Sequence, residues 1–170
     1  MPEPPSAASS LPVGEDMAFQ RRNWRAERIA WSIMAALVAA ALAGLFGTGP
    51  ASRASVRDDA GLITVEYDRF LRLGSQTSLR ITLAPAAIVS GHATVELDRD
   101  FLRTFRLEGA DPAPASALAG PPGLRQVFRT EPGAVARFRL NLRAERIGPA
   151  GAGIGLTGGP QLRLAVFVYP

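Results

Sequence analysis

The chain contains no cysteine, and this absence removes several kinds of chemistry together. It can hold no disulfide framework, no thiolate nucleophile, no cysteine-ligated metal and no cysteine-linked lipid. Lysine is also absent, so all 19 basic residues are arginine, and a P-loop, which needs a lysine, is excluded. Because alanine, glycine and proline are abundant as well, we interpret the arginine bias as codon usage of a GC-rich genome.

Residues typical of catalytic sites are scarce. His92 is the only histidine, and because it shares the parity of Glu96 in an alternating segment, we expect it to be exposed. No serine lies in a G-x-S-x-G context. Residues 153–158 match G-x-G-x-x-G, but Gly159-Pro160 blocks the helix of a dinucleotide site, so a mobile loop is predicted there. We predict no catalytic residue, cofactor or metal site.

Charge is absent from Ile29 through Ser52. Within this stretch, Ile29 to Phe46 is apolar and would form about 27 Å of helix, and extension to Gly49 gives about 31 Å, which matches the hydrocarbon core of a bilayer. We therefore predict one transmembrane helix over residues 29–49.

The orientation of this helix follows from its flanks. Four arginines precede it, with a single acid among them, Glu27: Arg21, Arg22, Arg25 and Arg28. Because positive charge stays on the cytoplasmic side, we expect the N-terminus inside the cell and the C-terminal part outside. The lipid bilayer is thus a predicted partner.

Two alternatives to a permanent anchor stay open. Ser52-Arg53-Ala54 has the small residues that a signal peptidase accepts, so the leader could instead be removed. Arg21-Arg22 also suggests twin-arginine export, although no serine or threonine precedes the pair. The charged leader and the apolar stretch are longer than in a usual signal peptide, which favours the anchor.

Small residues recur at every fourth position of the predicted helix, at Ala36, Ala40, Gly44 and Thr48. Such a ridge allows two helices to approach closely in lipid. It predicts a homo-oligomer formed through the helix, with the abundance of alanine as the alternative explanation.

The other segments divide by composition. Residues 1–14, rich in proline, serine and alanine, are predicted to be a disordered cytoplasmic tail, and residues 15–28 a basic juxtamembrane segment. Residues 50–60 contain proline, glycine and two adjacent aspartates and are predicted to be a linker. Residues 61–170 are numerous enough to bury a core of their own.

From Leu62 onward apolar residues recur at every second position, which is the period of half-buried strands. The inward-facing sets are Ile63, Val65 and Tyr67; Leu79, Ile81 and Leu83; Ala93, Val95 and Leu97; Phe138, Leu140 and Leu142; and Leu162, Leu164, Val166 and Val168. Six or seven such strands, without a helix, predict an all-β domain, an antiparallel immunoglobulin-like β-sandwich outside the membrane. The Cys-Trp-Cys core of immunoglobulin domains is absent.

Two ladders of charge form the candidate interaction surface. One is acidic and one is basic: Glu96, Asp98 and Asp100, and Arg137, Arg139 and Arg143. A calcium site needs six or more oxygens from converging segments, which one acidic ladder does not supply. We expect the ladders to pair across the sheet or to be solvated; as an alternative, the arginines recognise anionic lipid headgroups, a polysaccharide or an acidic protein patch.

A net charge of +4 invites a nucleic-acid partner, but the distribution of the arginines argues against one. Four of them flank the predicted membrane helix, and the rest alternate with apolar residues at strand spacing. We therefore expect no nucleic acid among the partners.

The stretch Arg22 to Arg28, followed by the apolar helix and by Gly44-Leu45-Phe46-Gly47-Thr48-Gly49-Pro50, resembles the start of small uncharacterised bacterial single-pass membrane proteins. In these proteins the same layout precedes one outer β-sandwich domain. The resemblance implies an inner-membrane location and this fold, and it implies no activity.

Together these features predict a non-enzymatic, single-pass protein of the bacterial inner membrane. Its periplasmic sandwich would be an interaction or accessory module for another membrane or envelope component, such as an inner-membrane protein. The alternative is a periplasmic protein released near Ala54 that binds an anionic glycan or lipid. An enzyme would instead need a cleft where acids or His92 converge.

Overall fold

The computed structural model describes residues 17–42, 49, 51–159 and 161–170, and these belong to two compact units. One unit is Met1–Ala39 and the other is Ala40–Pro170. The predicted tail, residues 1–14, lies outside the described residues.

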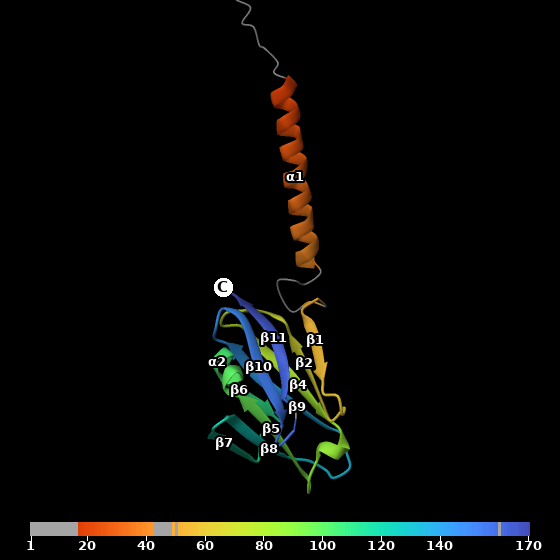
Figure 1. Cartoon of the computed structure of the whole chain (residues 1–170), viewed down its shortest axis with the longest axis vertical. Helices are drawn as coiled ribbons and strands as arrows, with labels where there is room; N and C mark the ends of the chain where they lie inside the picture. Colours follow the sequence, from red (N-terminus) through yellow and green to blue (C-terminus); the bar gives the residue numbers. More distant parts are fainter. Residues whose placement is uncertain (1–16, 43–48, 50, 160) are drawn as a thin grey trace, which may run out of the picture. The chain divides into compact units, whose positions relative to one another are not determined.

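The first unit holds all but the last three residues of helix α1, Met17–Leu42, drawn in orange-red in Figure 1. Its sequence has no glycine or proline and is rich in alanine and arginine, which favour helix. The Ser32 hydroxyl donates to the carbonyl of Arg28 at 2.8 Å, and the Arg28 guanidinium lies 3.7 Å from the ring centre of Trp24. The predicted juxtamembrane segment thus continues into the predicted membrane segment as one helix from Met17 to Leu42.

Among the helices that the structure describes, none has the length and apolarity needed to cross a membrane. The predicted transmembrane segment, residues 29–49, includes residues 43–48, which lie outside the described part of the chain.

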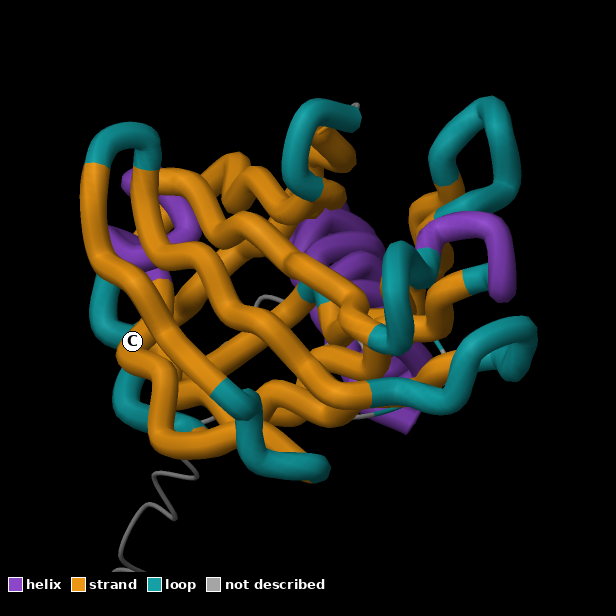
Figure 2. The backbone as a smooth tube through the Cα atoms, turned by 90° about the horizontal axis from the view of Figure 1, so that it is seen from below, coloured by secondary structure: helices purple, strands orange, loops and turns teal. Residues whose placement is uncertain are grey.

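The second unit is built from strands, drawn in orange in Figure 2. In chain order its elements are β1 (Arg53–Arg57), β2 (Ile63–Asp68), β3 (Phe70–Arg72), β4 (Gln76–Leu83), a 3₁₀ turn η1 (Pro85–Ala87), β5 (His92–Asp98), α2 (Arg99–Thr104), β6 (Phe105–Asp111), β7 (Ser116–Gly120), β8 (Gly123–Arg129), β9 (Ala136–Ala144), β10 (Gly148–Leu156) and β11 (Gln161–Tyr169).

These strands form two sheets. The five-stranded sheet has the order β1-β2-β4-β9-β6, and the six-stranded sheet has the order β3-β11-β10-β5-β8-β7. All neighbours are antiparallel except β3 and β11, which run parallel. One hydrophobic core contains residues of both sheets, so the predicted all-β sandwich is confirmed.

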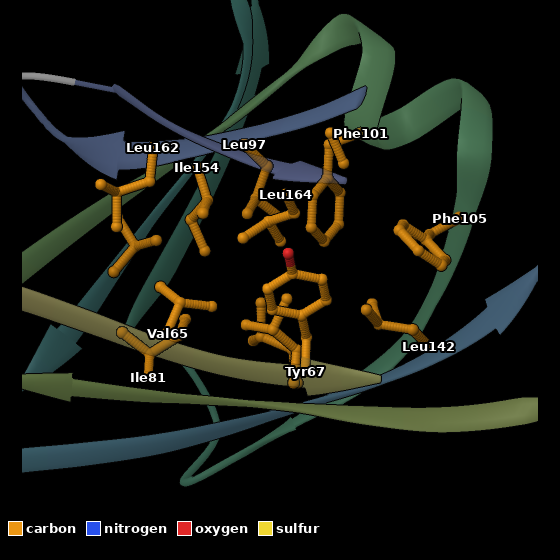
Figure 3. Packing of buried hydrophobic residues seen from close by; sticks show 14 of the residues in the cluster. Val65, Tyr67, Ile81, Leu97, Phe101, Phe105, Leu142, Ile154, Leu162 and Leu164 are labelled. Atoms are coloured by element: carbon orange, nitrogen blue, oxygen red, sulfur yellow. The ribbon is translucent and has the colours of Figure 1, made fainter. Parts of the chain in front are cut away.

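The core is made by the side chains that the alternating pattern predicted to face inward. All the predicted inward residues of β2, β4, β5, β9 and β11 are buried. Figure 3 shows the Tyr67 hydroxyl pointing from β2 toward the opposite sheet, where it accepts a hydrogen bond from the Ala165 amide at 3.3 Å. Phe128 of β8 stacks on Phe138 of β9 with ring centres 4.3 Å apart. The two sheets are therefore joined by packing along their length.

The predicted number of strands and the absence of helix are wrong. The described residues contain eleven strands, together with α2 and η1. The missed strands are β1, β3, β7, β8 and β10. Of these, β7 and β10 carry mainly alanine, glycine and serine, residues that give little periodic hydrophobic signal. The predicted loop at residues 153–158 largely belongs to β10, and the turn there covers residues 157–159.

The predicted linker, residues 50–60, is also wrong, because it contains β1. Ser52 is fully buried: its carbonyl accepts from the Arg69 amide at 2.7 Å, and its hydroxyl accepts from the Phe70 amide at 3.2 Å. Ala54 lies opposite Tyr67 in the sheet and is buried. The folded domain therefore begins about ten residues earlier than residue 61.

This difference predicts unequal stabilities for two fragments of the sandwich. A fragment starting at Ala51 keeps Ser52, whereas one starting at Ser55 loses it. At about 1 kcal/mol for each net hydrogen bond, we expect the shorter fragment to be less stable by about 2–3 kcal/mol. Urea unfolding followed by circular dichroism measures this difference, and equal midpoints would contradict the structural role of Ser52.

Candidate interaction surfaces

The acidic ladder does not lie on one strand, because β5 ends at Asp98. Glu96 faces outward from the six-stranded sheet, where its Oε1 lies 2.6 Å from Nη2 of Arg125 on β8. The same oxygen accepts from the hydroxyl of Thr157 at 3.1 Å. Glu96 therefore ties β5 to β8 and to the turn after β10.

Asp98 is buried and joins four elements. Its Oδ1 accepts from the amide of Phe101 at 2.7 Å and from the amide of Gly153 at 3.0 Å. Its Oδ2 accepts from Nη1 of Arg163 at 3.1 Å. The carboxylate thereby holds the end of β5, the start of α2, and strands β10 and β11 together.

Two glycines make room for this arrangement. A Cβ at Gly153 would lie 2.1 Å from Oδ2 of Asp98, and a Cβ at Gly123 would lie 1.9 Å from the carbonyl oxygen of Leu97. Both distances are far below van der Waals contact, and the atom that Gly123 would meet is backbone. The close approach of β8 and β10 to the end of β5 therefore depends on these glycines.

The local sequence explains why the strand turns into a helix here. Aspartate is a favoured N-cap because its side chain accepts from an amide of the first turn, and Asp98 has the extended backbone of an N-cap. Asp100 lies in the first turn and Arg103 in the last, as the helix dipole prefers. Asp100 is exposed on α2, 3.5 Å from Arg163. The three alternating acids therefore do not form a ladder on one strand: Glu96 lies on β5, Asp98 ends β5 and caps α2, and Asp100 lies in the first turn of α2.

The basic ladder lies on β9 and faces outward, as predicted. Arg137 and Arg139 are exposed, and Arg143 is half-buried. However, β9 belongs to the five-stranded sheet and β5 to the six-stranded sheet, so the expected pairing of the two ladders is wrong. Arg143 instead binds Glu108 of β6 and donates to the carbonyl of Gly74 at 3.0 Å.

Arg137 and Arg139 have no carboxylate within ion-pair distance among the described residues. Arg139 lies opposite Arg80 of β4, and Arg80 is paired with Glu66 at 3.0 Å. We call the surface of Arg80, Arg137 and Arg139 the arginine face. Its guanidinium groups present many donors on a flat sheet, an arrangement suited to an anionic partner that spans several of them.

An open hollow of about 490 Å³ lies beside this face, on β1, β2 and β4. Polar side chains line it, among them Arg53, Ser55, Glu66, Asp68, Ser78 and Arg80. Across the described part of the chain, no three histidine, aspartate or glutamate side chains gather as a metal site would require. The hollow therefore extends the polar surface next to the arginine face.

The remaining candidates are dispersed. His92 is exposed, as predicted, with Nδ1 2.9 Å from the carbonyl oxygen of Ser90. On α1, Ala36 is exposed and Ala40 is half-buried, whereas Gly44 and Thr48 lie outside the described residues. The predicted helix-packing face thus stays a prediction.

No protein-family model matches the chain, and no curated protein matches it. Any function must therefore be argued from these residues and surfaces.

The structural role of Asp98 leads to a prediction. Asp98→Ala leaves the buried amides of Phe101 and Gly153 without their acceptor, so we expect a loss of about 3 kcal/mol in unfolding free energy. Asp98→Asn keeps one acceptor oxygen and should lose less. The control Asp100→Ala changes an exposed carboxylate and should stay within about 0.5 kcal/mol of wild type. Urea unfolding measures all three, and similar effects of Asp98→Ala and Asp100→Ala would refute the assignment.

Proposed function

We propose that this protein is a single-pass protein of the bacterial inner membrane. Its β-sandwich lies on the periplasmic side and is a non-catalytic interaction or accessory module for another membrane or envelope component. The predicted immunoglobulin-like connectivity of the sandwich stays part of this proposal.

The observation that carries the proposal is the exposure of the apolar side chains of α1. They are 54–82% exposed: Ile29, Trp31, Ile33, Met34, Leu37, Val38 and Leu42. At 100° per residue they are spread around more than half of the helix, and the chain beyond Arg28 stays uncharged to Ser52. A helix that is apolar on most sides requires an apolar environment, and a bilayer supplies one.

The basic end of α1 supports the proposed orientation. Arg22, Arg25 and Arg28 lie before the apolar part, and Arg28 stacks on Trp24 there. Tryptophan and basic side chains are both common at a membrane–water boundary. With the arginines on the cytoplasmic side, the sandwich would lie outside the cytosol.

The burial of Ser52 favours a retained anchor over release near Ala54. Cleavage after Ala54 would remove Ser52 from its hydrogen bonds with Arg69 and Phe70 and would shorten β1. A released domain would thus lack part of its own edge strand.

The polar groups of the sandwich support a binding role. Glu96 and Glu108 each hold two neighbouring strands together through ion pairs, and Asp98 ties β5 to β11 across β10. These three acids therefore have structural roles. Arg137 and Arg139, in contrast, have donors to offer an acidic surface of a partner.

Membrane insertion can be tested with charge in the apolar part of α1. We expect the full-length protein to sediment with membranes and to need detergent for extraction. Leu37→Arg with Val38→Arg should move it to the soluble or degraded fraction, because each arginine near the centre of a membrane helix costs about 3 kcal/mol. The matched control Asn23→Arg with Ala26→Arg adds the same charge in the basic segment and should stay in the membrane. Wild-type protein that is soluble without detergent would refute the anchor.

The binding role can be tested by photo-crosslinking in cells. A crosslinking residue placed at Arg137 or Arg139 should capture a specific companion, because these positions are exposed on the arginine face. The same residue at Arg129, an exposed arginine on β8 of the other sheet, serves as the control and should not capture it. Identical products from both sheets, or none, would count against the arginine face.

A further inference from the structure

The end of the sandwich at which the chain enters from residue 51 has a surface of its own. Hydrogen bonds bring distant segments together there: the Arg69 amide donates to Ser52, the Phe167 amide to Arg69, and the Leu73 amide to Tyr169, each at 2.7 Å. Within this unit, Figure 1 shows the start of β1 and the C-terminus at the same end of the sheets. We call this the entry end.

Apolar side chains are exposed at the entry end. Phe167 is 45% exposed and Ile147 53% exposed. Phe167 faces outward between Val166 and Val168, which are buried, and it lies in register with Phe70 of β3 and Pro149 of β10. The entry patch is this group together with the exposed Leu73: Phe70, Leu73, Ile147, Pro149 and Phe167.

Arginines surround the entry patch. Arg53, Arg69, Arg72 and Arg146 are exposed, and none of them forms an ion pair with another described residue. The glutamate next to them, Glu145, is already paired with Arg106 at 2.6 Å.

An acid of β2, Asp68, lies opposite Arg53 in the sheet and accepts from Thr77 at 3.4 Å. The far end of the sandwich carries both signs of charge, with Asp58, Asp59 and Glu131 beside Arg57 and Arg129. The entry end therefore groups four exposed arginines, without an ion pair among the described residues, around an apolar patch.

We propose that the entry end docks on an anionic lipid surface, with the entry patch at headgroup level and the four arginines on lipid phosphates. This inference rests on the proposed membrane anchor. Residues 43–51 are the connection to α1 and span at most about 30 Å when extended, so an inserted helix would keep Ser52 close to the bilayer. Aromatic, aliphatic and arginine side chains together are the composition of proteins that lie at a membrane interface.

The arrangement of the arginines favours a lipid surface over a protein as the partner of the entry end. A phosphate-bearing surface offers many equivalent anions to arginines that come from different segments of the chain, whereas a single protein patch would need a matched acidic pattern. Attraction of this kind weakens as salt is added, because exposed charges are screened. Docking should therefore require anionic lipid and fall with ionic strength.

The absence of cysteine allows a clean test with the full-length chain in vesicles. A fluorophore is attached at Ile147→Cys or Leu73→Cys at the entry end, or at Val89→Cys at the far end, where Val89 is 72% exposed. The vesicles contain phosphatidylglycerol with phosphatidylcholine, or phosphatidylcholine alone, and a lipid with a nitroxide on its headgroup acts as quencher.

We expect strong quenching at both entry-end positions with phosphatidylglycerol, weak quenching with phosphatidylcholine alone, and weak quenching at Val89 in both. Arg69→Gln, Arg72→Gln and Arg146→Gln should each reduce the docked-to-undocked ratio about fivefold. The matched controls Arg57→Gln and Arg129→Gln, at the far end, should leave it unchanged.

A probe at Leu37→Cys separates this inference from the anchor. If Leu37 is shielded from a water-soluble thiol reagent while Ile147 is quenched no more than Val89, the docking proposal is overturned and the anchor stands. If Leu37 reacts freely, the anchor fails and docking fails with it.

Quenching that is equal in both vesicle types would overturn the role of anionic lipid, and shielding of Ile147 only in cell membranes would assign the patch to a protein partner.

Discussion

The burial of one face of each sheet against the other is the constraint on which every outer surface of this domain depends. Because strands alternate, fixing Val65 and Leu140 in the core forces their neighbours in the strand, among them Arg139, outward. A slip of one residue would bury arginines and expose the core, so the register is strongly determined. The arginine face is thus a consequence of core packing as well as of its own composition.

The acids of the sandwich contribute to its construction. Asp98 lies where β5 gives way to α2, and a single carboxylate satisfies two amides and one guanidinium there. Such an arrangement is favourable because a buried carboxylate is stable when its oxygens are hydrogen-bonded and its charge is paired. The glycines beside it are needed for the same reason, since a side chain at Gly153 would occupy the place of that carboxylate.

Much of the fold could be predicted where inward positions carry large apolar residues, as on β9, where Phe138 and Leu142 alternate with polar neighbours. The strands β1 and β10 were missed because their inward residues include Ala54 and Ala152, whose small side chains give little contrast. The candidate site was predicted only in part. The alternation of apolar and polar residues along the strand correctly predicted that Arg139 faces outward. The sheet to which a strand belongs depends on pairing between distant segments, and a local sequence pattern does not indicate this.

The charged groups left without an ion pair and the apolar side chains left exposed indicate the environment that the folded chain suits. Of the charges in the sandwich, Glu96 and Asp98 are used in internal ion pairs, whereas Arg137 and Arg139 of the arginine face and the four arginines of the entry end are unpaired within the described part of the chain. Exposed apolar side chains occur on α1 and in the entry patch, and also at Val89, Leu102, Leu118 and Val135. Apolar and cationic surfaces that occur together, on both sides of the connecting residues 43–51, are complementary to a medium that is apolar inside and anionic at its surface. A bilayer is such a medium, and it would satisfy both sets of groups at once.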